Sequence, residues 1–184
     1  MKELSLNILD IAENSVSAKA TLIEVAILES VAENVLEIKI TDNGCGMSEE
    51  FLKTVTDPFS TTRKTRKVGM GISLLKLAAE QSGGKFEIKS TLGKGTVVTA
   101  LFEHNHIDRP PLGDIGQTIS ALVSCNLDID FIYRHSFEDN TFSFSTKEVV
   151  EMIPDVPLNT PDVVLWMQDY INEGIANVSS KNVN

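Results

Sequence analysis

The chain has 184 residues and a mass of 20.2 kDa, enough for one compact domain with a modest extension. Hydrophobic residues make up 42% and charged residues 23%, a composition that excludes a disordered or fibrous chain. The net charge of -10 argues against a general nucleic-acid binder, which would be basic. No apolar run is long enough to span a membrane, and acidic residues interrupt the N-terminus where an export signal would be apolar. With only two cysteines and no CxxC pair, we expect a cytoplasmic protein.

Charge is divided unevenly along the chain. Residues 1–104 carry 12 Lys/Arg and 14 Asp/Glu, whereas residues 105–184 carry 4 and 12. We therefore expect a first domain over 1–104 and an acidic extension over 105–184. A basic cluster at 63–67 lies within the first part, and a near-neutral domain with one basic loop is compatible with binding a small polyanion.

Hydrophobic periodicity predicts the elements of the first part. The predicted helices are 3–17, 48–55 (with Ser48 as its cap) and 72–82. The predicted strands are 21–28, 35–41, 85–90 and 96–102. Residues 57–71 contain a proline, basic residues and glycines without a period, so they are expected to form a loop.

The second part begins with a connector marked by proline and glycine at 104–116. The elements expected after it are a helix over 117–124, strands over 129–136 and 141–145, and a helix over 162–175. The polar tail from 177 is expected to fray. The whole pattern predicts an α+β fold, with helices on one face of a mixed, mainly antiparallel sheet and a C-terminal αββα extension. Elements this short cannot bury a large core alone, so the extension is expected to pack on the first domain.

Glycine-bearing segments carry the candidate site chemistry. They are 42–46 directly after a strand, 69–71 at the start of a helix, and 93–96 in a hairpin. They match neither a P-loop nor a GxGxxG dinucleotide pattern. A helix that opens on glycines exposes free N–H groups suited to phosphates, and the Asp42 carboxylate could accept a hydrogen bond from an exocyclic amine. On the first helix, Asp10 and Asn14 are four residues apart, so their oxygens share a face and suit Mg²⁺.

These segments resemble the ATP-binding domain shared by DNA gyrase, heat-shock chaperones of the ninety-kilodalton type, histidine kinases and the mismatch-repair protein MutL, known as the GHKL or Bergerat fold. The resembling motifs are the N box at 10–21, the G1 box at 42–47, the histidine-kinase F box at 57–63, the G2 box at 69–75, and the kinase-like ending at 83–96. The resemblance covers residues 1–103. It implies a Bergerat-type α/β sandwich closest to histidine-kinase catalytic domains.

The resemblance also implies roles for single residues. Asn14 would coordinate Mg²⁺ at the ATP phosphates, Asp42 would bind the adenine amino group, and Met47 and Thr96 would lie beside the base. The glycines after Asp42 would let the backbone pass close to the base, and residues 57–71 would form a mobile lid. The nucleotide-binding residues that it implies are Asn14, Asp42, Gly44, Gly46, Met47, Phe59, Thr61, Thr62, Arg63, Gly69, Met70, Gly71, Ile72 and Thr96.

Two departures from the family pattern leave two functions open. The catalytic position, a glutamate in the hydrolysing members, is Asp10 here, whose side chain is one methylene shorter. None of the three histidines lies in the context of a phospho-accepting histidine, so any acceptor is expected on another protein. One function is phosphoryl transfer in trans to a partner protein, as by histidine or serine kinases. The other is an ATP-dependent switch or scaffold with little turnover, or a slow ATPase. We expect a protein partner and a possible homodimer, without nucleic acid or membrane.

Overall fold

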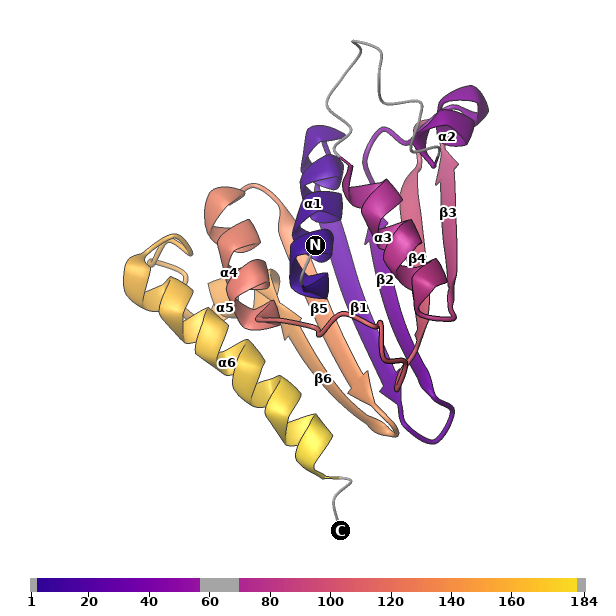
Figure 1. Cartoon of the computed structure of the whole chain (residues 1–184). Helices are drawn as coiled ribbons and strands as arrows, with labels where there is room; N and C mark the ends of the chain where they lie inside the picture. The colour runs from indigo at the N-terminus through magenta and orange to yellow at the C-terminus, as the bar shows by residue number, and fades with distance from the viewer. Residues whose placement is uncertain (1–2, 57–69, 182–184) are drawn as a thin grey trace.

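The structure is a computed structural model that describes residues 3–56 and 70–181 (Figure 1). The helices are α1 (Leu4–Ser17), α2 (Glu49–Val55), α3 (Gly71–Gln81), α4 (Ile115–Cys125), α5 (Thr146–Met152) and α6 (Pro161–Ser180). The strands are β1 (Leu22–Ser30), β2 (Val35–Asp42), β3 (Lys85–Thr91), β4 (Gly95–Glu103), β5 (Asp130–Phe137) and β6 (Asn140–Ser145). Within the described ranges, no helix combines the length and apolarity needed to cross a bilayer.

The strands form one six-stranded sheet in the order β3-β4-β2-β1-β5-β6. All neighbouring pairs are antiparallel except β1 and β5, which run parallel with Leu22 opposite Asp130. Helices α1, α3, α4 and α6 lie over one face of this sheet (Figure 1). The predicted α+β architecture with a mixed, mainly antiparallel sheet is therefore confirmed.

The core lies between the sheet and these helices because the strands alternate. In β1, Ile23, Val25 and Ile27 are at most 1% exposed, whereas the residues between them are only partly covered. Apolar residues of α1, such as Leu4 and Ile8, are fully buried in the same core. Each such side chain contributes about 1.5–3 kcal/mol by leaving water.

The two parts of the chain share this sheet, since β5 and β6 of the second part continue it beyond β1. The division into domains at residue 104 stays a prediction. In the second part, α5 is an additional helix that periodicity did not indicate, because it has only seven residues. The prediction of a frayed tail from 177 was wrong as far as Ser180: α6 continues to that residue, and Val178 is 5% exposed.

Candidate functional site

Asp42 ends β2 with both carboxylate oxygens already held. The Ser15 hydroxyl of α1 donates to Asp42 Oδ2 at 2.6 Å, and the backbone N–H of Gly44 donates to Oδ1 at 2.8 Å. Ser15 is 3% exposed, whereas Asp42 is partly exposed. The hydrogen bonds therefore fix the orientation of the carboxylate while solvent can still reach it.

Thr96 lies directly opposite Asp42 in the pairing of β2 with β4. Its hydroxyl bonds to that of Ser90 at 2.9 Å, and Ser90 Oγ also accepts the N–H of Met47 at 2.8 Å. The loop after Asp42 is thus tied to the β3–β4 hairpin. Sequence reasoning missed Ser90 and Ser15, although the hairpin register, which places Ser90 opposite Thr96, was a usable signal for the first.

The glycines after Asp42 are required by the protein's own packing. Gly46 has a φ of +66°, and a Cβ there would collide with the carbonyl oxygen of Thr91. A Cβ on Gly44 would lie 2.8 Å from the carbonyl oxygen of Ala18. Because these two glycines have no side chains, the loop packs closely against the end of α1 and against the β3–β4 hairpin. This packing brings Asp42, Met47 and Thr96 to the same region.

Helix α3 begins beside the polar face of α1. A Cβ on Gly71 would lie 2.6 Å from Asp10 Cβ, so the first turn of α3 packs on Asp10. The N-cap Met70 makes no capping bond through its side chain, and the first N–H groups of a helix carry partial positive charge. One turn further along α1, the Asn14 Nδ2 atom is buried and has no hydrogen-bond partner among the described residues. A buried amide without a partner costs about 1–3 kcal/mol, which favours a place where a ligand supplies the contact.

Two of the remaining predicted site residues are described by the structure and five are not. Met70 is 62% exposed, whereas Ile72 is 4% exposed and packs in the core. Five others lie outside the described residues, namely Phe59, Thr61, Thr62, Arg63 and Gly69.

A hollow of about 230 Å³ lies on the outer face of α3, where Met70, Leu74 and Leu77 line it. It is lined by none of Asn14, Asp42 and Thr96. The surface of this hollow is mostly apolar, and the fixed polar groups around Asp42 and Thr96 lie outside it, so the candidate site is at those polar groups.

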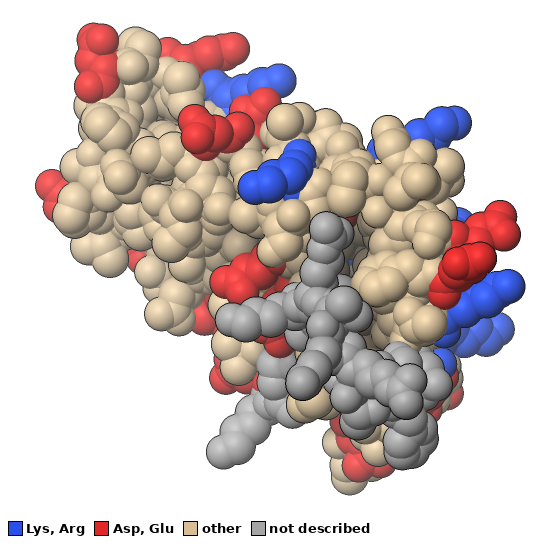
Figure 2. Space-filling view, turned by 90° about the horizontal axis from the view of Figure 1, so that it is seen from above, with Lys and Arg blue, Asp and Glu red and all other residues tan. Residues whose placement is uncertain are grey.

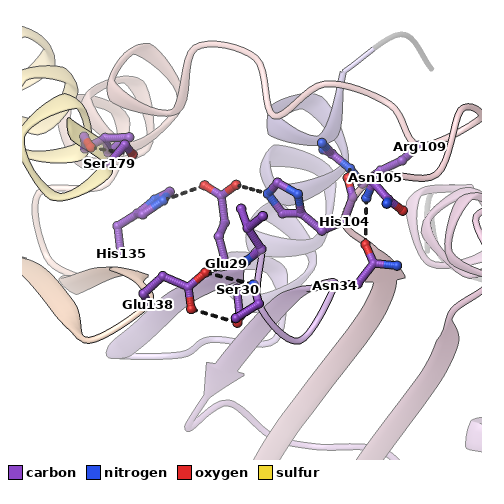
Figure 3. A network of polar contacts seen from close by, with 12 residues as sticks. Glu29, Ser30, Asn34, His104, Asn105, Arg109, His135, Glu138 and Ser179 are labelled. Carbon is purple, nitrogen blue, oxygen red and sulfur yellow. Dashed lines mark hydrogen bonds and ion pairs between the residues drawn. The ribbon is translucent and has the colours of Figure 1, made fainter. Parts of the chain in front are cut away.

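A second carboxylate network occupies the opposite end of β1 (Figure 3). Glu29 lies between two imidazoles, with His104 Nε2 at 2.9 Å from Oε2 and His135 Nε2 at 2.9 Å from Oε1. The Tyr133 hydroxyl lies 2.6 Å from the other ring nitrogen of His135. Burial raises the pKa of Glu29, but the hydrogen bonds from His135 and His104 outweigh it and hold that pKa below its ordinary value. The carboxylate is therefore ionised and accepts an N–H from each ring.

Burial and the nearby Glu29 charge raise the pKa of Tyr133 well above its ordinary value, so its hydroxyl keeps its proton. His135 and Tyr133 are 0% exposed. Both ring nitrogens of His135 and the Tyr133 hydroxyl have partners inside the protein. The arrangement therefore joins β1 to β5 and does not offer a binding site.

Comparisons with known proteins identify a family and structures of similar fold. The sequence model of the family "Histidine kinase-, DNA gyrase B-, and HSP90-like ATPase" matches residues 1–106, more than half of the chain. A protein of Shewanella frigidimarina named as a sensor protein is 34% identical over 103 residues, which are 55% of this chain and 16% of that protein. Sensor protein SrrB of Staphylococcus aureus is 38% identical over 73 residues, 37% of this chain and 12% of that protein.

The chain thus spans only a small part of the length of these relatives. Among solved structures, the N-terminal domain of a DNA repair protein superposes with a TM-score of 0.55 at 16% identity, over 79% of this chain and 53% of that one. At this identity the likeness concerns the fold alone. Because the family match covers the segment that contains Asp10, Asn14, Asp42 and Thr96, the chain belongs to the histidine kinase-, DNA gyrase B- and HSP90-like ATPase family.

Proposed function

We propose that this chain binds Mg-ATP between α1, the loop after β2 and the start of α3, and transfers the γ-phosphoryl group to a partner protein in trans. The observation that carries the proposal is the Asp42 carboxylate, fixed by Ser15 and Gly44 yet partly exposed. Membership of an ATPase family supports ATP as the ligand.

Asp42 is suited to selecting adenine. An ionised carboxylate offers about four acceptor positions, of which Ser15 and Gly44 use two. A remaining position can accept the exocyclic amine of adenine. Guanine carries a carbonyl at that ring position, which would face the carboxylate without a proton between them. Met47 and Thr96 would border the base from the loop and from β4.

The phosphates would lie between α1 and the first turn of α3. The first N–H groups of α3 and its positive end favour anions. The buried Asn14 Nδ2, without a partner among the described residues, could donate to a phosphate oxygen. The side-chain oxygen of Asn14 would hold Mg²⁺, which would neutralise phosphate charge when bound. Asp10 lies against Gly71, so its carboxylate is in place to orient a hydroxyl group or a water molecule.

A second candidate function is an ATP-dependent switch with little turnover. The observation that favours it is Asp10 itself, because its shorter side chain packs at Cβ against the start of α3 and reaches less far than a glutamate would. In that case nucleotide occupancy would alter contacts with a partner, and no phosphoryl group would be transferred.

Titration calorimetry with ATP and GTP, each with and without Mg²⁺, tests the binding proposal. We expect ATP to bind more tightly by about 10-fold or more, since the amine contact is worth about 1.5–3 kcal/mol. Asn14→Ala is expected to remove the Mg²⁺ dependence while the circular-dichroism spectrum stays unchanged. Equal affinities for ATP and GTP would refute the assignment of Asp42 to adenine.

Incubation with γ-labelled ATP and host lysate separates the two functions. Label on a protein supports transfer in trans, label as free phosphate alone supports slow hydrolysis, and no turnover supports the switch. Asp10→Asn tests the role of Asp10, because loss of a general base should lower turnover by about 10²–10⁴-fold. Turnover that survives Asp10→Asn unchanged would contradict the role of Asp10.

A further inference from the structure

The solvent face of α6 carries large apolar side chains where a surface helix normally carries polar ones. Leu165, Trp166 and Tyr170 are 60%, 39% and 42% exposed. They follow the spacing of one helix face, while Met167 and Ile171 on the opposite face are fully buried. We call Leu165, Trp166 and Tyr170, with the acids between and beside them (Asp162, Asp169 and Glu173), the α6 aromatic face.

The two rings of this face are held in place before any partner arrives. Trp166 and Tyr170 stack at a centroid distance of 5.1 Å and an interplanar angle of 14°. Tyr170 in turn packs against Phe142 of β6 in an edge-to-face arrangement, with the ring centroids 5.4 Å apart. Because contacts with the sheet already hold the two rings, a ligand would not lose free energy by ordering them on binding.

The charge around these rings has one sign. The exposed positions Asp162, Asp169 and Glu173 are acidic, and α6 contains no basic residue. Residues 105–184 hold 4 Lys/Arg against 12 Asp/Glu, and two of those basic side chains pair with acids, Arg134 with Glu24 and Lys147 with Asp130. The left margin of Figure 2, the side on which α5 and α6 lie in Figure 1, shows acidic side chains and no basic ones in that view.

We propose that the α6 aromatic face binds a basic amphipathic segment of a partner protein. Lysine or arginine side chains of such a segment would lie over the face of Trp166 that Tyr170 does not cover, and beside the carboxylates. A cation is attracted to the negative face of an aromatic ring, and the surrounding acids steer a basic partner toward the face. Apolar residues of the same segment would cover Leu165. A second copy of this chain fits less well, because two acidic faces repel each other.

Trp166 is the sole tryptophan of the chain, so its fluorescence reports directly on this face. The probe is a synthetic amphipathic helical peptide of lysine and leucine, and the control peptide has the same composition in scrambled order. We expect the helical peptide to shift the Trp166 emission and to bind more tightly than the scrambled one. Binding should weaken by about tenfold or more as salt rises, because charge contributes much of the attraction.

Paired variants separate this face from the general acidity of the chain. Asp169→Asn with Glu173→Gln should weaken binding by about tenfold, whereas the same charge change at the exposed acids Glu33 and Asp128 should leave it within about twofold. Leu165→Ser, a surface change, should weaken it as well. Equal losses in the two double variants, or an emission unaffected by the peptide, would overturn the proposal.

Sedimentation velocity tests whether a second copy of this chain occupies the α6 aromatic face instead. A concentration-dependent dimer that Asp169→Asn with Glu173→Gln strengthens would assign the face to a second copy and overturn the proposal, whereas a monomer supports it. ATP affinity, measured on the same variants, should not change. The proposal for α6 and the proposed nucleotide site can therefore fail independently.

Discussion

Two carboxylates at opposite ends of the β1–β2 hairpin are held by similar geometry for different purposes. Asp42 accepts hydrogen bonds at 2.6 and 2.8 Å, and Glu29 has two partners at 2.9 Å. The partners of Asp42 are a hydroxyl group and a backbone N–H, neither of which carries a charge. The partners of Glu29 are two imidazoles, and the next group along, Tyr133, is fully buried.

The difference shows what makes a carboxylate available to a ligand. Asp42 is partly exposed and keeps free acceptor positions at a loop edge, whereas Glu29 is 9% exposed. Glu29 also bridges the two parts of the chain, because His104 follows β4 and His135 belongs to β5. We therefore expect changes at Asp42 to alter binding and changes at Glu29 to alter stability.

The largest effect is expected for Glu29→Ala. Its removal leaves the N–H of the fully buried His135 without its acceptor, at about 1–3 kcal/mol, and also takes the partner of the partly exposed His104. The free energy of unfolding in urea should fall by about 2–5 kcal/mol. ATP affinity, measured where the variant is still folded, should remain unchanged.

Glu24→Ala is the matched control for that variant. Glu24 lies on the same strand but on the other face, where it pairs with Arg134 at 3.5 Å on the surface. Exposed ion pairs contribute about 0–1 kcal/mol, so its loss should be small. Equal destabilisation by the two variants would mean that the Glu29 network has no special part in stability.

Asp42→Asn should give the opposite result. The amide keeps the shape of the side chain and an oxygen for the Gly44 N–H, so unfolding should change by no more than about 1 kcal/mol. It loses the negative charge that would face the adenine amine, and ATP affinity should fall about 10- to 100-fold in calorimetry. If Asp42→Asn binds ATP normally, or unfolds as readily as Glu29→Ala, then Asp42 and Glu29 do not differ as a binding carboxylate and a stabilising carboxylate.

Much of the first half of the chain could be predicted because local patterns determine it. Branched residues located β1 and alternation located β2, and a carboxylate followed by glycines at the end of a strand indicated Asp42. The spacing of Asp10 and Asn14 likewise placed both on one face of α1. The contact of Asp10 with Gly71 is not local, and no periodicity could show that the start of α3 packs there.

The Glu29 network was missed, although part of its signal was present. Glu29 is in phase with the buried residues Val25 and Ile27, and His135 is in phase with Tyr133. Because alternate residues of a strand share a face, both polar side chains belong to the covered face, where a polar group needs a hydrogen-bond partner. Their meeting depends on the parallel pairing of β1 with β5, between residues 106 positions apart, and hydrophobic patterns do not specify such a register.

Lowering the pH should reveal the charge of Glu29. Its pKa in the folded protein lies below the ordinary value of 4.5, because the hydrogen bonds from His135 and His104 outweigh the effect of burial. Stability from the ionised form is therefore fully present above that value and is lost as pH falls through the folded-state pKa. The difference in unfolding free energy between wild type and Glu29→Gln should be largest above about pH 5 and should narrow toward about pH 3. A difference that stays constant with pH would show that the charge does not contribute.

The smallest effect is expected for Ser15→Ala. The variant removes the 2.6 Å hydrogen bond to Asp42 Oδ2, while the bond from Gly44 remains, so the carboxylate loses part of its orientation and keeps its charge. ATP affinity should fall about 2- to 5-fold, equivalent to about 0.5–1 kcal/mol. Ser5→Ala is the matched control, because Ser5 is also buried on α1 but its hydroxyl faces Glu3 at 3.4 Å. If Ser15 acts through Asp42, adding Ser15→Ala to Asp42→Asn should lower affinity no further, whereas independent losses would add. Additive losses in calorimetry, or a loss as large with Ser5→Ala, would show that Ser15 does not position the carboxylate.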